Sequence, residues 1–162
     1  MEFSNETALL QEIYKGSAMG AEAIGLLLPK VKNAGFRSDL QTQYEQYEAT
    51  KKQAEQELSN LGQCPQELTK GQQMMLQSAL CCKTLLNQET SHLAKLMIEG
   101  SNMGILTLTG VLNSYGNPKD NPAQSQTEAQ YAQQAGDPAV ALARETIRHE
   151  TDNIDRLKVY LV

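Results

Sequence analysis

Gly16-Ser17-Ala18-Met19-Gly20 returns 84 residues later as Gly100-Ser101-Asn102-Met103-Gly104. The same offset also pairs apolar positions outside the two phrases, including Leu9 with Leu93. Both copies lie in stretches of helical periodicity, and a glycine inside a helix costs about 1 kcal/mol relative to alanine. We therefore interpret the glycines as inward-facing positions where two core helices cross closely: Gly16, Gly20, Gly100 and Gly104. An apolar ligand near the two methionines is the alternative, but methionine at helical spacing is more typical of core packing.

Apolar residues recur at helical spacing along most of the chain, and no segment has the alternation of a strand. We expect helices over about 5–31, 39–61, 66–87, 89–115 and 138–161, a loop over 116–122 and a short helix over 125–134. Ser4 or Asn5 is expected to cap the first helix, and Asn33-Ala34-Gly35 to end it. Ser38 or Asp39 is expected to cap the second helix, and Asp137 the last.

These helices predict an all-α fold in a single domain over 1–162. An offset of 100 residues lays the second helix on the last, so the chain reads as two similar antiparallel hairpins. The segment 66–87 has no counterpart in the first hairpin, and about 20 helical residues span about 30 Å. That length is enough to carry the chain back along the bundle. A duplicated hairpin joined by such a helical crossover is the arrangement of a ferritin-like four-helix bundle.

Two stretches of the sequence resemble small bacterial ferritin-like proteins, including those of spore-coat type. One is Thr90-Ser91-His92-Leu93-Ala94 with the Met97–Gly104 stretch that follows, and the other is the ending from Glu150 to Leu161. The resemblance covers nearly the whole chain. It implies the ferritin-like fold and raises the question of a dinuclear metal site, which such proteins build from a glutamate on each of two helices and Glu-x-x-His on each of the other two.

The metal pattern is incomplete in this sequence. Glycines replace the expected mid-helix glutamates, and the second and last helices offer Thr50-x-x-Gln53 and Glu150-x-x-Asn153. One Glu-x-x-His occurs, but it lies at the start of its helix. A complete dinuclear site is therefore not expected. The candidate ligands for an atypical site, with iron or manganese as the candidate metals, are Glu150, Glu12, Glu48, Glu89, His92 and His149.

Glu150 occupies the centre of an otherwise apolar helix stripe. A buried carboxylate is costly unless it is paired, hydrogen-bonded or protonated. We expect a buried contact between Glu150 and Lys51, joined by Tyr47, that fixes the register of the helices. A mononuclear metal site that uses Glu150 is the alternative.

Composition excludes several classes of partner. The chain has 162 residues and a net charge of −5, with no concentrated basic region of the kind that binds nucleic acid or anionic membranes. No apolar run reaches the about 20 residues of a membrane span, and the N-terminus lacks the layout of a signal peptide. Cys64, Cys81 and Cys82 form no metal or redox motif. We expect a cytoplasmic protein.

Ser-His-Asp, Cys-His and phosphate-loop arrangements are all missing from the sequence, so enzymatic activity is left undecided and no cofactor is predicted. The first hypothesis is a non-enzymatic bundle of structural or protein-interaction type that forms a homodimer, because one bundle would not fully cover the apolar segment 66–87. The alternative is a metal-binding oxidoreductase or storage protein with an atypical site around Glu150.

Overall fold

Helices make up nearly all of the chain that the computed structural model describes, which is residues 4–115 and 136–162. The helices are α1 (Asn5–Leu27), α2 (Ala34–Asn60), α3 (Lys70–Leu85), α4 (Thr90–Tyr115) and α6 (Pro138–Leu157), with 3₁₀ turns η1 (Leu28–Lys30) and η2 (Lys158–Tyr160). No strand occurs within the described residues, which confirms the all-α prediction. None of the helices in these two ranges is long and apolar enough to cross a bilayer.

Side-chain caps set the starts of the helices. Ser4 accepts a hydrogen bond from the backbone N–H of Thr7 at 3.2 Å, and Asp137 accepts one from Ala139 at 2.8 Å, as expected. The expected start of the second helix at Ser38 or Asp39 is wrong. Asn33 caps that helix through the N–H of Phe36 at 2.9 Å, so the residues expected to end one helix begin the next. The predicted loop 116–122 and the predicted helix 125–134 lie outside the described residues.

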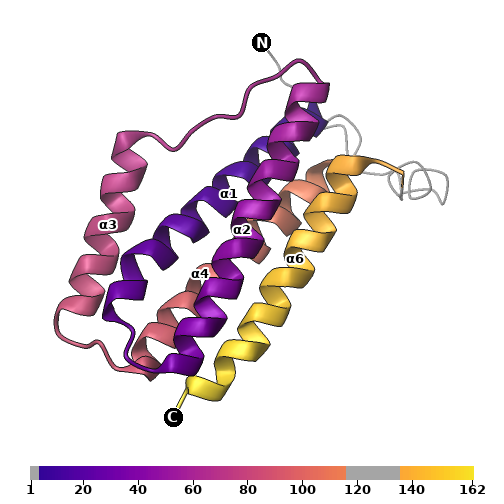
Figure 1. Ribbon diagram of the computed structural model, residues 1–162. Coiled ribbons are helices and arrows are strands. Elements are labelled where there is room, and N and C mark those ends of the chain that lie inside the picture. Colours follow the sequence, from indigo (N-terminus) through magenta and orange to yellow (C-terminus); the bar gives the residue numbers. More distant parts are fainter. Residues whose placement is uncertain (1–3, 116–135) are drawn as a thin grey trace.

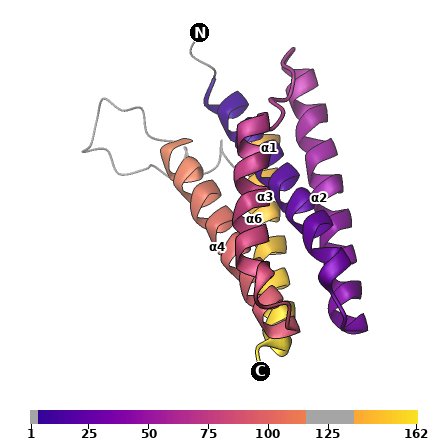
Figure 2. The same cartoon turned by 90° about the vertical axis from the view of Figure 1, so that its left-hand side faces the viewer.

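Four helices form the bundle, and α3 lies outside it (Figures 1 and 2). Helices α1 and α2 are antiparallel neighbours, as are α4 and α6, and α3 runs along the outer side of α1. Helix α3 is thinly packed, because Thr84 is its one buried residue while Met74 and Met75 are 65% and 68% exposed.

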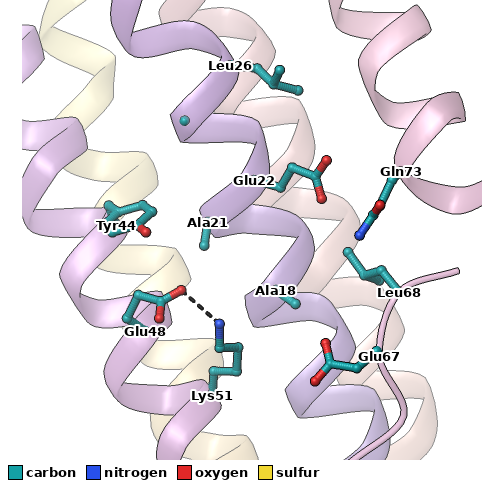
Figure 3. A pocket seen from close by; sticks show the side chains of 11 residues that line it. Ala18, Ala21, Glu22, Leu26, Tyr44, Glu48, Lys51, Glu67, Leu68 and Gln73 are labelled. Atoms are coloured by element: carbon teal, nitrogen blue, oxygen red, sulfur yellow. Dashed lines mark hydrogen bonds and ion pairs between the residues drawn. The ribbon is translucent and has the colours of Figure 1, made fainter. Parts of the chain in front are cut away.

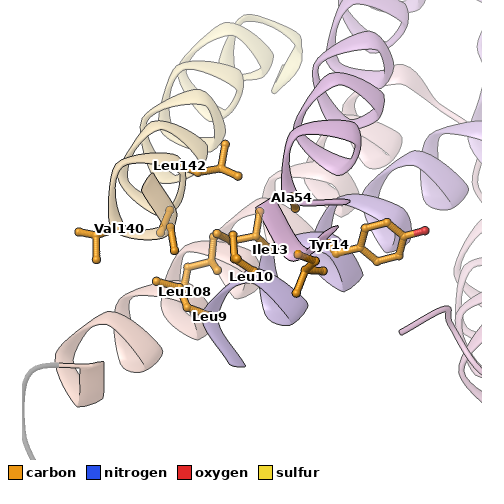
Figure 4. Close-up of a cluster of buried hydrophobic side chains, with 11 residues drawn as sticks. Leu9, Leu10, Ile13, Tyr14, Ala54, Leu108, Val140 and Leu142 are labelled. Carbon is orange, nitrogen blue, oxygen red and sulfur yellow. The ribbon is translucent and has the colours of Figure 1, made fainter. Parts of the chain in front are cut away.

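The apolar core divides into two clusters along the bundle. One cluster joins the first half of α1 to the end of α2, α4 near Leu108 and the start of α6 near Val140 (Figure 4). The other cluster joins the second half of α1 to Phe36 and Leu40 of α2, to the start of α4 and to the end of α6. Burying a side chain of this size contributes about 1.5–3 kcal/mol. Between the clusters lie several buried polar residues, among them Ser17, Gln43, Ser101 and Glu150.

The interpretation of the repeated glycines as close-crossing positions is wrong for three of the four. A Cβ added at Gly16, Gly100 or Gly104 would meet no atom of the described residues within 4 Å. Gly20 does make a close approach, but to the ring of Tyr47 rather than to another backbone. The serine is the residue that each phrase turns inward, because Ser17 and Ser101 are both only 2% exposed.

Candidate functional site

A buried polar layer crosses the bundle between the two apolar clusters. Each of the four bundle helices contributes to it, with Ser17 from α1, Gln43 and Tyr47 from α2, Ser101 from α4 and Glu150 from α6. All five side chains are buried, and Glu150 is 6% exposed. The layer therefore places one carboxyl group and several neutral polar groups out of contact with bulk water.

Hydrogen bonds join α2, α4 and α6 within this layer. The Gln43 Nε2 donates to the Tyr47 hydroxyl at 3.0 Å and to the Ser101 Oγ at 3.4 Å. The Tyr47 hydroxyl donates to the Glu150 Oε2 at 3.0 Å, and Ser101 lies near enough to lower the pKa of the same carboxyl group. The Gln43 amide thus orients two hydroxyl groups toward one carboxyl group.

Burial has the largest effect on the ionisation of this layer. It raises the pKa of Glu150, while nearby Ser101 and the hydrogen bond from Tyr47 lower this pKa. The pKa of Tyr47 is raised too, first by burial and then by the charge of Glu150. The phenol therefore remains a hydrogen-bond donor, and Glu150 favours its neutral form more than a surface glutamate does.

The expected pairing of Glu150 with Lys51 is wrong, whereas the expected contact of Glu150 with Tyr47 is present. The Lys51 Nζ lies 3.0 Å from the Oε1 of Glu48, one helical turn away on α2. This arrangement keeps the ammonium group near solvent, so Lys51 avoids the desolvation penalty of a buried ion pair.

The remaining predicted ligands do not converge. Glu12 lies 3.9 Å from Lys15, His149 lies 3.8 Å from Glu145, and the Nε2 of His92 lies 2.8 Å from the backbone oxygen of Lys83. Glu48 is engaged with Lys51, and Glu89 is exposed just before α4. Across residues 4–115 and 136–162, no three acidic, histidine or cysteine side chains lie close enough to hold a metal ion together.

Two polar atoms of the layer lack a hydrogen-bond partner among the described residues, namely the Gln43 Oε1 and the Ser17 Oγ. An unsatisfied buried polar atom costs about 1–3 kcal/mol. The layer is therefore a hydrogen-bond network that contains one carboxyl group and these two unsatisfied polar atoms.

An open cleft lies on the outside of the bundle, between α1, α2 and the chain that leads into α3 (Figure 3). Its volume is about 420 Å³. The lining combines three glutamates and one lysine with small and apolar side chains: Ala18, Ala21, Glu22, Gly25, Leu26, Tyr44, Glu48, Lys51, Glu67, Leu68 and Gln73.

Two buried side chains of α1 hold the outer wall of this cleft in place. Gln11 donates to the backbone oxygen of Cys64 at 2.8 Å and accepts from the backbone N–H of Gln66 at 2.8 Å. The hydroxyl of Tyr14 donates to the Oε1 of Glu67 at 2.5 Å, and both burial and this bond raise the pKa of Tyr14. Sequence reasoning missed these residues, because their partners lie more than 50 positions away along the chain.

Besides the buried polar layer and the cleft, the outward face of α4 is a third candidate site. No charged residue occurs from Gly100 to Tyr115, although most of this stretch faces outward and Met103 and Leu106 are 70% and 73% exposed. Charged side chains are the usual occupants of an exposed helix face.

Comparison of the chain with protein-family models, curated protein sequences and solved structures gives no match.

Proposed function

We propose that this protein is a non-enzymatic helical bundle of structural or protein-interaction type, and that it assembles as a homodimer through the outer face of α4. The proposal includes a ferritin-like arrangement, in which α1–α2 and α4–α6 are the two hairpins and α3 is the crossover. The mid-bundle position of a metal centre is taken in this arrangement by the Gln43–Tyr47–Ser101–Glu150 network.

The uncharged outer face of α4 is the observation that carries the proposal. Exposed apolar side chains that stand singly are ordinary on a protein surface, but a helix face without charge over four turns is typical of a surface that meets another protein. Met103 and Leu106 lie one turn apart on this face and supply the apolar contact.

The internal repeat supports a second helix packed on this face. In the first half of the chain, Glu22 and Gly25 of α1 face the lead-in to α3, and Glu22 accepts a hydrogen bond from Gln77 of α3 at 3.3 Å. The offset of 84 residues places Leu106 and Thr109 of α4 at the equivalent positions, and both are exposed.

A second copy of the chain is the partner that the charge favours. Each copy carries a net charge of −5, so the charged surfaces of two copies repel each other on average. Two α4 faces can meet without that repulsion. Their contact would bury Met103 and Leu106 of both copies.

Light scattering on the purified chain, in line with gel filtration, tests the proposal at micromolar concentration. We expect a dimer for the wild type and a monomer for the double variant Met103→Lys, Leu106→Lys. Val159→Lys is the matched control, because Val159 is also 70% exposed but lies in η2, and it should remain dimeric. A wild type that is monomeric at micromolar concentration would overturn the proposal that the outer face of α4 is the dimer interface. A control variant that dissociates like the double variant would overturn it too.

The metal-binding alternative is tested separately. Elemental analysis of protein purified without chelator, with melting temperatures before and after addition of iron or manganese, distinguishes the two functions. Stoichiometric metal with a raised melting temperature would favour an oxidoreductase or storage role and would contradict a purely structural polar layer.

A further inference from the structure

We propose that the cleft between α1, α2 and the chain leading into α3 binds a linear aliphatic polyamine. The dimerisation of α4 does not enter this argument, because no residue of the cleft belongs to α4. The cleft has the volume of a small-molecule site, about 420 Å³ against a typical range of about 300–1,000 Å³.

The charge of the lining selects a cation. The one lysine of the cleft, Lys51, is engaged by Glu48 at 3.0 Å. Among the described residues, Glu22 and Glu67 accept hydrogen bonds from neutral donors, Gln77 at 3.3 Å and Tyr14 at 2.5 Å, and these leave the negative charges in place. Two carboxylates without a cationic partner in the cleft therefore face the same space, as Figure 3 shows.

The acidic side chains of the lining favour an organic cation over a metal ion. No three acidic side chains of the described residues come close enough to share a metal ion. Ammonium groups joined by methylene chains can instead reach separate carboxylates. Each ammonium group would form a charge-assisted hydrogen bond with the carboxylate it meets.

The apolar part of the lining suits the methylene segments of such a chain. Ala18, Ala21 and Gly25 present a floor without long side chains on α1, and Leu26 and Leu68 add apolar area beside it. Methylene groups buried against this floor leave water, and this adds a hydrophobic contribution to binding.

The wall that carries Glu67 is fixed in position. Gln11 binds the backbone on both sides of Pro65, Tyr14 binds Glu67 itself, and Leu68 is buried. A wall held by two buried polar side chains of α1 keeps the cleft open without a ligand. The binding site is thus preorganised, which lowers the cost of binding.

Equilibrium dialysis of the full chain with labelled spermidine at low ionic strength tests the proposal. We expect saturable binding of one spermidine per chain, about 3- to 10-fold weaker in Glu22→Gln and in Glu67→Gln. The glutamine at position 67 keeps an acceptor for Tyr14, so this variant changes the charge without releasing the wall. Glu45→Gln is the control, because it makes the same charge change at an exposed α2 position outside the cleft, and it should bind like the wild type.

A second variant separates shape from charge. Ala18→Leu fills the floor of the cleft and leaves the net charge unchanged, and we expect it to weaken spermidine binding by at least as much as Glu22→Gln. The proposal is overturned if Ala18→Leu binds like the wild type, if Glu45→Gln is as weak as Glu22→Gln, or if magnesium at matched ionic strength displaces all of the spermidine. Absence of saturable binding to the wild type would also refute it. None of these results depends on whether the chain is a dimer.

Discussion

Gly20 and Gly104 occupy the same place in the two copies of the repeated phrase, but the structure gives them opposite surroundings. A Cβ at position 20 would lie 2.5 Å from the Cε2 and Cζ atoms of Tyr47 and 2.9 Å from its Cδ2. A Cβ at position 104 would meet nothing within 4 Å among the described residues. Alanine should therefore be costly at position 20 and harmless at position 104.

The two substitutions share one term, which cancels in their difference. Both replace glycine with alanine inside a helix, a gain of up to about 1 kcal/mol. Only Gly20→Ala forces the Tyr47 ring to move, and this ring is held by its hydrogen bonds to Gln43 and Glu150. Overpacking of this kind costs about 1–3 kcal/mol. We expect Gly20→Ala to be less stable than Gly104→Ala by about that amount.

Urea unfolding followed by far-ultraviolet circular dichroism measures the difference directly. A double-mutant cycle with Tyr47→Leu then identifies the cause, because the cost of Gly20→Ala should largely disappear once the ring is removed. Equal stabilities of Gly20→Ala and Gly104→Ala would refute the contact. A cost of Gly20→Ala that persists in the Tyr47→Leu background would place its origin elsewhere.

Two further predictions concern hydrogen-bonded carboxyl groups. Burial raises the pKa of Glu150 above its value in the unfolded chain, so the folded state binds the proton more tightly and wild-type stability falls as pH rises from about 4. Glu150→Gln has no such group to titrate and lacks this loss. Urea unfolding should therefore show that the free energy of unfolding of the variant, relative to that of the wild type, is higher at pH 8 than at pH 4. An equal difference at the two pH values would contradict the prediction. Tyr14→Phe removes the hydrogen bond to Glu67 and should cost about 1 kcal/mol. It should also speed proteolysis within 63–69, and unchanged cleavage would show that the bond does not hold this segment.

Much of the fold could be predicted because helical periodicity and capping act locally. Asp137 and Ser4 cap the helices as expected, and the lack of strands in 4–115 and 136–162 follows from apolar spacing alone. The start of α2 could not be settled in this way, because Asn33-Ala34-Gly35 carries both a termination signal and a capping residue. The packing of Phe36 and Leu40 into the core decides between them.

The candidate site was predicted in part. Glu150 and its contact with Tyr47 follow from one acidic residue on an apolar stripe. The partner Lys51 was wrong because helical phase alone does not tell whether a long side chain reaches inward or bends back to a neighbour such as Glu48. Sequence reasoning missed Gln43. A polar residue on a largely polar helix does not stand out in the sequence, and only the structure shows that Gln43 is buried.

The repeated phrase contributes an inward-facing serine, Ser17 or Ser101, to the buried polar layer, and this layer bears on the register of the helices. If α6 slid by one helical turn, about 5.4 Å, many apolar contacts of the two clusters would be replaced by similar ones. Glu150, however, would leave the hydroxyl of Tyr47, and a buried carboxyl group that loses its donor costs about 1–3 kcal/mol. The polar layer therefore selects one register of α6 against α2 and α4. Ser101 belongs to the same layer, and its inward orientation leaves Met103 and Leu106 on the exposed side of α4.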